Sequence, residues 1–116
     1  MRNKNDYIKV KDENINKFGI NVWAENEEVN EFLNRLPDSH LGVYIIKKIF
    51  DYKGVKIKRL VITTERDEEK FFHDERNRTL YISLQTFLRF MYQGFISGKK
   101  SPLKLASFAH ENGIAL

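Results

Sequence analysis

The sequence predicts an α+β fold: a small antiparallel sheet of three to four strands, built on a long β-hairpin and covered by two to three helices. Residues of high strand propensity fill 43–64 on both sides of a Lys53-Gly54 turn, which is typical of a hairpin. Apolar residues recur at helical spacing in 24–36 and 84–97. The 116 residues, of which 41% are hydrophobic and 13% aromatic, suffice for one compact core.

The N-terminal third is predicted to contain a flexible end, a short strand and a helix. Residues 1–14 are polar and unpatterned, so we expect a flexible segment there and a single domain over 15–116. Alternation of apolar with small or polar residues favours a strand at 18–23. The helix expected at 24–36 begins with glutamates, which suit its positive end, and Pro37 ends it.

The C-terminal part is predicted to contain one more strand and two helices. A short strand is expected at 79–82, after which Ser83 can cap a helix over 84–97. A further helix is expected at 102–112, because a serine-proline pair precedes it. Gly113 and the apolar residue after it are typical of a Schellman cap at the end of that helix.

The net charge of +4 is distributed unevenly, and the predicted hairpin carries most of the excess. Residues 41–60 contain six basic side chains and one acidic side chain. Pairing across the tight turn arranges four cations as a basic belt around the middle of the ribbon: Lys47, Lys48, Lys58 and Arg59. Like charges opposite one another destabilise a sheet by up to roughly 1 kcal/mol per pair. Because burial without partners would cost more, we expect this part of the ribbon to leave the core.

The exposed ribbon is the predicted binding site. Its cations alternate with aromatic side chains, which suits a phosphate backbone with stacked bases or an acidic protein groove. The expected nucleic-acid-binding or partner-binding residues are Lys47, Lys48, Phe50, Tyr52, Lys53, Lys56, Lys58 and Arg59. The alternative is that acidic residues of the same chain, in 25–31 or 65–69, fold over the belt and neutralise it.

The composition excludes several classes of binding and catalytic site. The chain has no cysteine, which excludes disulfides, thiolate metal sites and thiol catalysis. There is no long apolar run and no apolar leader at the N-terminus, so we expect a cytoplasmic protein without a membrane partner. His40, His73 and His110 lack metal-ligand spacing, and neither a hydrolase elbow nor a phosphate loop is present. We therefore expect no cofactor, no metal site and no catalytic residue.

The C-terminal string LASFAHENGIAL resembles the active-site helix of zincin metallopeptidases. His110 and Glu111 match the first zinc ligand and the general base of that motif. Ile114 occupies the position of the second ligand, and a zinc ion held by one histidine cannot activate water. The resemblance therefore implies at most a degenerate relative of that family. Ordinary helix termination by Asn112 and the glycine after it is the alternative.

A nuclease-like pattern is also present. Pro37-Asp38 with Glu68-x-Lys70 imitates the PD-(D/E)xK arrangement, in which two acids hold Mg²⁺ and a lysine orients the attacking water. That chemistry needs the acids on adjacent strands, whereas Asp38 is expected in a turn and Glu68 in a charged connection. Short matches of this kind are frequent in a chain with 16 acidic residues.

Non-enzymatic binding is the function that these observations favour. We expect a regulatory protein that engages nucleic acid, or a nucleic-acid-processing protein, through the basic hairpin. Asn, Lys and Ile make up 34 residues and Ala only four, a bias typical of AT-rich genomes such as those of phages and mobile elements, which encode inhibitor-like proteins of this size. The alternatives are a degenerate zincin-like or Mg-dependent nuclease-like domain, and an assembly subunit that buries the hairpin tip in a homo-oligomer.

Overall fold

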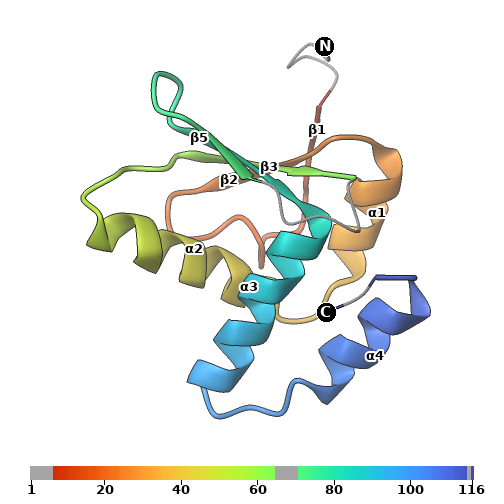
Figure 1. Ribbon diagram of the computed structural model, residues 1–116. Helices are drawn as coiled ribbons and strands as arrows, with labels where there is room; N and C mark the ends of the chain where they lie inside the picture. Colours follow the sequence, from red (N-terminus) through yellow and green to blue (C-terminus); the bar gives the residue numbers. More distant parts are fainter. Residues whose placement is uncertain (1–6, 65–70, 115) are drawn as a thin grey trace.

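The computed structural model describes residues 7–64, 71–114 and 116 of the chain (Figure 1). Within these ranges the fold is α+β, as the sequence predicts, with a five-stranded sheet and four helices. In chain order the elements are β1 (Ile8–Lys9), β2 (Asn21–Ala24), α1 (Glu27–Arg35), α2 (His40–Tyr52), β3 (Arg59–Thr63), β4 (Phe71–Asp74), β5 (Thr79–Ser83), α3 (Leu84–Ser97) and α4 (Leu103–Glu111).

The sheet is mixed and not purely antiparallel, which corrects one part of the prediction. Its strands lie in the order β1-β2-β3-β5-β4. The central strands β2, β3 and β5 are parallel to one another, while β1 and β4 pair antiparallel at the two edges. Parallel neighbours need a long connection between them, and α1 and α2 supply that connection between β2 and β3.

The predicted hairpin at 43–64 is wrong, because its first half forms the helix α2. Val43 and Ile46 are fully buried, and Phe50 packs against the same core, so the buried positions follow helical spacing. The second half of the predicted hairpin contains β3, which pairs with β2 and β5. Strand propensity depends strongly on context, and here packing on a neighbouring helix overrides it.

Two glycines explain why α2 packs so closely on α3. A Cβ atom at Gly42 would lie 2.8 Å from side-chain atoms of Phe87 and Met91. A Cβ atom at Gly94 would lie 2.9 Å from the Cβ atom of Leu41. Each glycine therefore accepts a side chain of the other helix at a distance that no larger residue allows. This contact favours the helix over a strand at 40–52.

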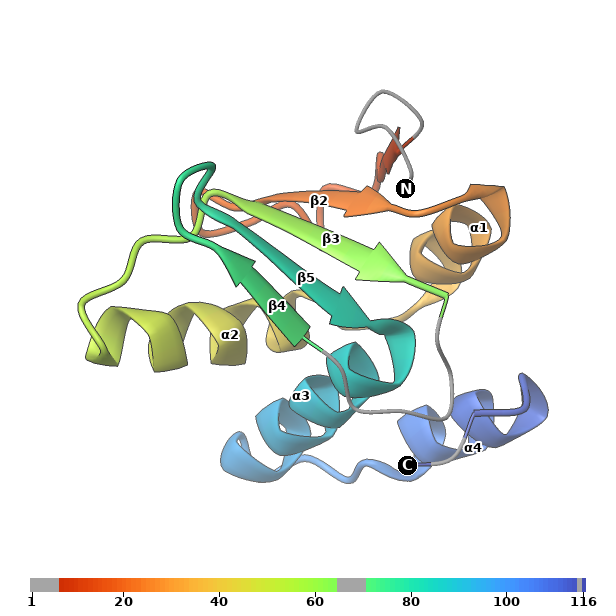
Figure 2. The same cartoon turned by 45° about the horizontal axis from the view of Figure 1, so that its top comes forward.

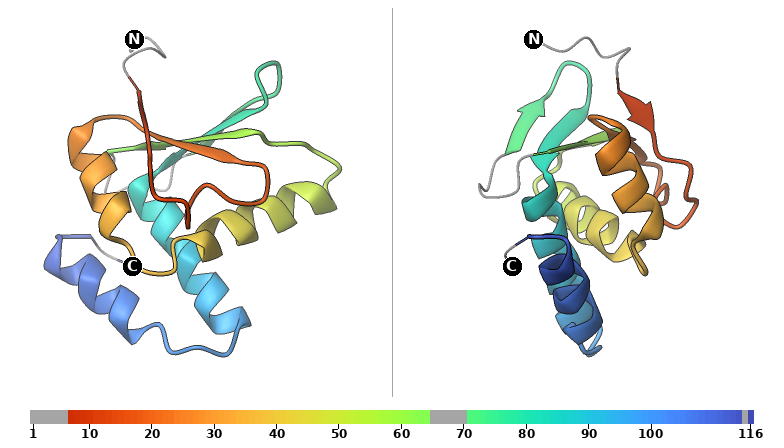
Figure 3. Two further views of the ribbon diagram at one scale, coloured as in Figure 1. Left: turned by 180° about the vertical axis from the view of Figure 1, so that it is seen from behind. Right: turned by 90° about the vertical axis from the view of Figure 1, so that its right-hand side faces the viewer.

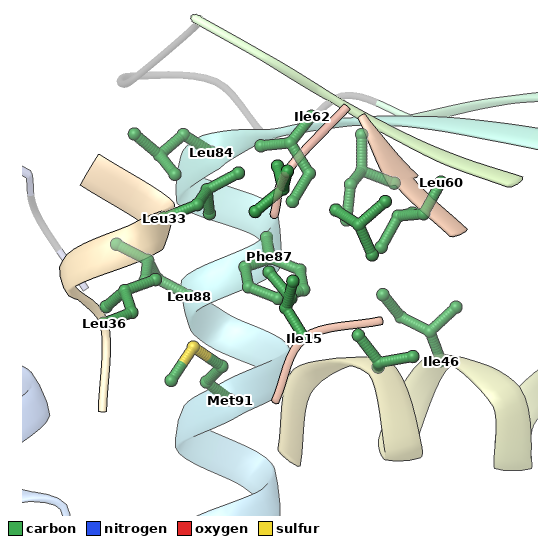
Figure 4. Close-up of a cluster of buried hydrophobic side chains, with 14 of the residues drawn as sticks. Ile15, Leu33, Leu36, Ile46, Leu60, Ile62, Leu84, Phe87, Leu88 and Met91 are labelled. Atoms are coloured by element: carbon green, nitrogen blue, oxygen red, sulfur yellow. The ribbon is translucent and has the colours of Figure 1, made fainter. Parts of the chain in front are cut away.

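The helices gather on one side of the sheet (Figure 2). Leu60 and Ile62 of β3 lie on that side and pack with Ile46, Phe87 and Met91 in the core (Figure 4). Because side chains alternate along a strand, the residues between them lie on the other face. No described helix covers that second face, which we call the open face (Figure 2).

The helix ends agree with local sequence signals. At the start of α3 the Ser83 hydroxyl accepts a hydrogen bond from the backbone N–H of Thr86 at 3.1 Å. After α4, Gly113 has a φ of 72°, and the N–H of Ile114 donates to the carbonyl of Ala109 at 2.9 Å. This is the predicted Schellman cap. None of the helices in the described ranges is long and apolar enough to cross a membrane.

The sheet begins inside the segment for which the sequence predicts a flexible end. Ile8 and Lys9 pair with β2, and Val10 has no exposed surface. Between β1 and β2 the chain passes beside the sheet, and Ile15 on this segment is fully buried (Figure 3). Figure 3 also shows that the turn between β4 and β5 extends beyond the rest of the sheet.

Candidate functional site

The basic belt predicted for the ribbon does not exist in that form. Lys47 and Lys48 belong to α2, so they do not oppose Lys58 and Arg59 across two paired strands. The inference from cross-strand repulsion is therefore wrong, and so is the exposed hairpin tip expected as an oligomer contact. The helix explains how two adjacent lysines are accommodated, because a helix of this length has a side that faces water.

The eight predicted site residues are not all brought together. Lys48, Tyr52 and Lys53 lie on the exposed side and at the end of α2, and Tyr52 is 93% exposed. Among the described residues, none of these three lines a pocket together with the other predicted site residues. These three residues therefore stand apart from the rest of the candidate site.

Four of the predicted residues do meet, around a hollow between α2 and the start of β3. Its volume is about 250 Å³, and it is lined by Lys47, Phe50, Lys56 and Lys58 with Asp51, Ile57 and the segment 18–20. We call it the helix-side pocket. The Nζ atom of Lys47 lies 2.9 Å from Oδ2 of Asp51, so an ion pair within α2 neutralises that lysine. Lys56 and Lys58 form no ion pair with any carboxylate in the described ranges.

Arg59, the last of the predicted residues, lies on the open face. The next residue, Leu60, belongs to the core, so Arg59 and Val61 point away from the helices. Val61 is nevertheless only 3% exposed. Side chains from the neighbouring strands therefore cover it, and these side chains define the surface beside Arg59.

Aromatic side chains cross the open face in a row. The register aligns Trp23 of β2 with Val61, Val61 with Tyr81 of β5, and Tyr81 with Phe72 of β4. The ring centroids of Phe72 and Tyr81 are 6.1 Å apart, and Phe72 is 65% exposed. The ring of Tyr7, from the residue before β1, lies 6.3 Å from that of Tyr81. We call Trp23, Tyr81 and Phe72 the aromatic row.

A hollow of about 350 Å³ opens beside this row, and we call it the face pocket. Its lining comes from four segments that are distant in sequence: Tyr7, Trp23, Arg59, Val61, Asn77, Thr79 and Tyr81. The register places Val61 beside Tyr81 and Arg59 beside Thr79, so β3 and β5 supply its base. The volume lies near the lower end of the ~300–1,000 Å³ typical of small-molecule sites.

The polar side chains around the face pocket include Arg59, Asn77, Thr79 and Tyr81. The Nε1 atom of Trp23 is itself shielded from water and has no hydrogen-bond partner in the described ranges. The Thr79 hydroxyl donates to the backbone carbonyl of Asn77 at 3.0 Å, and the Asn77 Nδ2 donates to Oδ2 of Asp74 at 2.7 Å. Burial raises the pKa of Tyr81, with a smaller contribution from Tyr7, so its hydroxyl keeps the proton at neutral pH.

Arg59, at the start of β3, lines the face pocket, and further cations lie near it in the chain and in the turn between β4 and β5. The backbone N–H groups of Lys58 and Arg59 donate to the carbonyl oxygen of Arg78 at 2.8 and 3.1 Å, so the β4–β5 turn lies beside them. We call the five cations of this region the cationic edge: Lys56, Lys58, Arg59, Arg76 and Arg78. None of them forms an ion pair within 7–64 and 71–114. The nearby Asp74 has its pKa lowered, first by the Asn77 side chain.

Reasoning from the sequence missed the aromatic row. A signal for Tyr81 was present, because it alternates with the apolar residues Leu80 and Ile82 and so lies on the opposite face of its strand. No comparable signal joins it to Phe72 or Trp23. Their alignment depends on which strands pair, and in what register.

The residues of the two enzyme alternatives do not form a site among those described. His110 and Glu111 are exposed at the end of α4, and Ile114 lies beyond the helix end. Asp38 lies in the turn between α1 and α2, whereas Glu68 and Lys70 lie outside the described residues. Within the described ranges, no three His, Asp or Glu side chains gather closely enough to hold a metal ion.

Comparison with models of protein families, with curated proteins and with solved structures finds no match.

Proposed function

We propose that this chain is a non-enzymatic protein that binds single-stranded nucleic acid across its open face. Bases stack on the aromatic row, and the phosphates lie along the cationic edge. The observation that carries the proposal is the register that aligns Trp23, Tyr81 and Phe72 on a face without a described helix, beside cations without ion pairs.

The aromatic row favours a ligand with flat, accessible rings. Stacking of a base on an aromatic side chain contributes about 1–3 kcal/mol and tolerates any base, because every base has a π face. The bases of a duplex are already stacked on one another. A single strand is therefore the form of nucleic acid that suits Tyr81 and the exposed ring of Phe72.

The cationic edge favours a polyanion. A cation that binds a phosphate releases a condensed counterion, which makes the affinity dependent on salt. Lys56, Lys58 and Arg59 were expected to bind a partner, and in the proposed complex they do so together with Arg76 and Arg78. Lys56 and Lys58 also line the helix-side pocket, so the positive charge of the cationic edge extends from the open face toward that pocket.

An acidic protein surface is the other partner that the sequence allows. Such a surface would pair with the cationic edge, but it would leave the aromatic row without a role. The three aligned aromatic side chains are the reason for preferring nucleic acid.

The test is a titration of the full chain into a labelled oligonucleotide, followed by fluorescence anisotropy. We expect a single strand to bind more tightly than the duplex of the same sequence, with an affinity that falls as salt rises. Phe72→Ala should weaken binding about tenfold, because stacking on that ring is lost.

The matched control is Leu103→Ala, which removes an apolar side chain that is 72% exposed on α4, away from the open face. It should leave the affinity unchanged. Tighter binding to the duplex, or equal affinities for the wild-type chain and Phe72→Ala, would contradict the proposal.

A further inference from the structure

We infer that the face pocket holds one base of the bound strand and selects guanine, with Arg59 as the residue that recognises it. This inference rests on the proposed function, since it names the base that the same site prefers.

The shape of the pocket suits one planar ring system. Its 350 Å³ volume is flanked by the side chains of Tyr7, Trp23 and Tyr81. Val61, which is only 3% exposed, supplies an apolar base. A base that leaves the stack on the row therefore finds apolar contact on several sides, while its polar edge can point toward Arg59 and Asn77.

The guanidinium of Arg59 is the donor that the pocket presents. Arg59 is only a donor, and it has no ion pair within the described ranges. Its planar fork can donate two parallel hydrogen bonds. A ligand that brings two adjacent hydrogen-bond acceptors therefore suits this side chain.

The acceptors that the pocket does offer are on one side. Within the described ranges Oδ1 of Asn77 accepts no hydrogen bond, and the bond from its Nδ2 to Asp74 holds this amide in place. The Thr79 oxygen has donated its proton to the Asn77 carbonyl and can only accept. The ligand therefore needs donors on the edge that faces these two residues.

Guanine meets both requirements. Its O6 and N7 are two adjacent acceptors, which match the planar fork of an arginine with two parallel hydrogen bonds. Its other edge carries N–H donors that suit Asn77 and Thr79. Adenine replaces the acceptor O6 by an amino group, and thymine has no two adjacent acceptors. Cytosine has adjacent acceptors at N3 and O2, but its amino group lies on that same edge, so its opposite edge carries no N–H donor for Asn77 and Thr79.

The experiment compares thymidine oligonucleotides that differ at one central base. We expect the oligonucleotide with guanine to bind about tenfold more tightly than those with adenine, cytosine or thymine. Replacing that guanine by 7-deazaguanine, which lacks only the N7 acceptor, should remove most of the difference.

Arg59→Lys tests the role of the guanidinium, because it keeps the charge and removes the planar fork. The ratio of the affinities for the guanine and thymine oligonucleotides should fall to near one. Lys104→Arg makes the opposite exchange on α4, away from the open face, and should leave that ratio unchanged. Thermal unfolding of both variants shows whether the fold is kept.

The outcomes separate the inference from the function on which it rests. Equal affinities for all four bases, or a preference for another base, overturn the selection of guanine while single-strand binding stands. A guanine preference that survives in a folded Arg59→Lys variant overturns the role of Arg59. If no oligonucleotide binds at all, the proposed function fails and the inference fails with it.

Discussion

The backbone N–H of Arg59 donates a hydrogen bond to the carbonyl oxygen of Arg78 at 3.1 Å. This bond holds two cationic residues from distant parts of the chain side by side, one at the start of β3 and one in the turn before β5. Neither forms an ion pair with a described carboxylate. The cationic edge therefore depends on how β3 pairs with β5.

Removing the two arginines of the β4–β5 turn should reduce the salt dependence of binding. Each phosphate contact of a single strand contributes about 0.7 to the slope of log K against log salt. For Arg76→Ala with Arg78→Ala we therefore expect the slope to become shallower by about 1.4. The measurement is anisotropy of a labelled single strand at several salt concentrations.

The control for this double variant is Lys100→Ala with Lys104→Ala. Lys100 lies in the turn between α3 and α4, and Lys104 belongs to α4. Both helices lie on the side of the sheet away from the open face (Figure 2). The same loss of charge there should leave the slope within error of the wild-type value. Equal slopes for the two double variants would contradict the prediction, because the slope would then depend on the net charge of the chain and not on the position of the two arginines.

Gly42→Ala should destabilise the fold, because α2 and α3 would have to separate. Its Cβ atom would meet Phe87 and Met91 atoms at 2.8 Å, and overpacking of this kind costs about 1–3 kcal/mol. Urea unfolding measures the loss as a lower midpoint with an unchanged slope. Gly98→Ala is the control, since its nearest contact would be at 3.4 Å and its φ is −84°. If the two variants are equally stable, the close helix contact is not as described.

Gly113→Ala should destabilise the chain through its backbone alone. A Cβ atom there would meet nothing within 4 Å, but the φ of 72° lies in the left-handed region, where an alanine costs about 1–2 kcal/mol. Asn tolerates this conformation better. We therefore expect Gly113→Asn to lose less free energy of unfolding than Gly113→Ala. The reverse order would contradict the Schellman cap.

The pKa of Asp74 should respond to Asn77. The Asn77 side chain is the largest cause that lowers this pKa, and backbone N–H groups of Asn77 and Arg76 add to it. Asn77→Ala removes only the side-chain bond, so the pKa should rise part of the way to its ordinary value. An NMR titration of the Asp74 carboxyl group measures this, with Asn30→Ala as a control on α1.

The sign of the linked effect on stability follows from the direction of the shift. A carboxyl group whose pKa is lower in the folded state stabilises the fold above its unfolded pKa. That contribution is lost as the pH falls through the folded pKa of Asp74. Asn77→Ala should therefore make the unfolding free energy less dependent on pH in the acidic range. An unchanged profile would mean that the turn does not hold this carboxylate.

Part of the candidate site could be predicted from the sequence. The excess of positive charge in 41–60 was visible, and Lys56, Lys58 and Arg59 from that segment belong to the cationic edge. Lys48 and Tyr52 came from the same segment but stand apart on the outer side of α2. The difference arises because neighbouring side chains spread around the axis of a helix, whereas they alternate between the two faces of a strand.

By itself the sequence determined the features that depend on neighbouring residues: the α+β class, the Ser83 cap of α3 and the glycine cap after α4. These rely on hydrogen bonds and apolar spacing within a few residues, so local patterns predict them. The tertiary structure alone decided that 40–52 is a helix and that β2, β3 and β5 run parallel. Such choices depend on contacts between distant segments, above all the approach of Gly42 to Phe87. The alignment of Trp23, Tyr81 and Phe72 on one face follows from the same contacts.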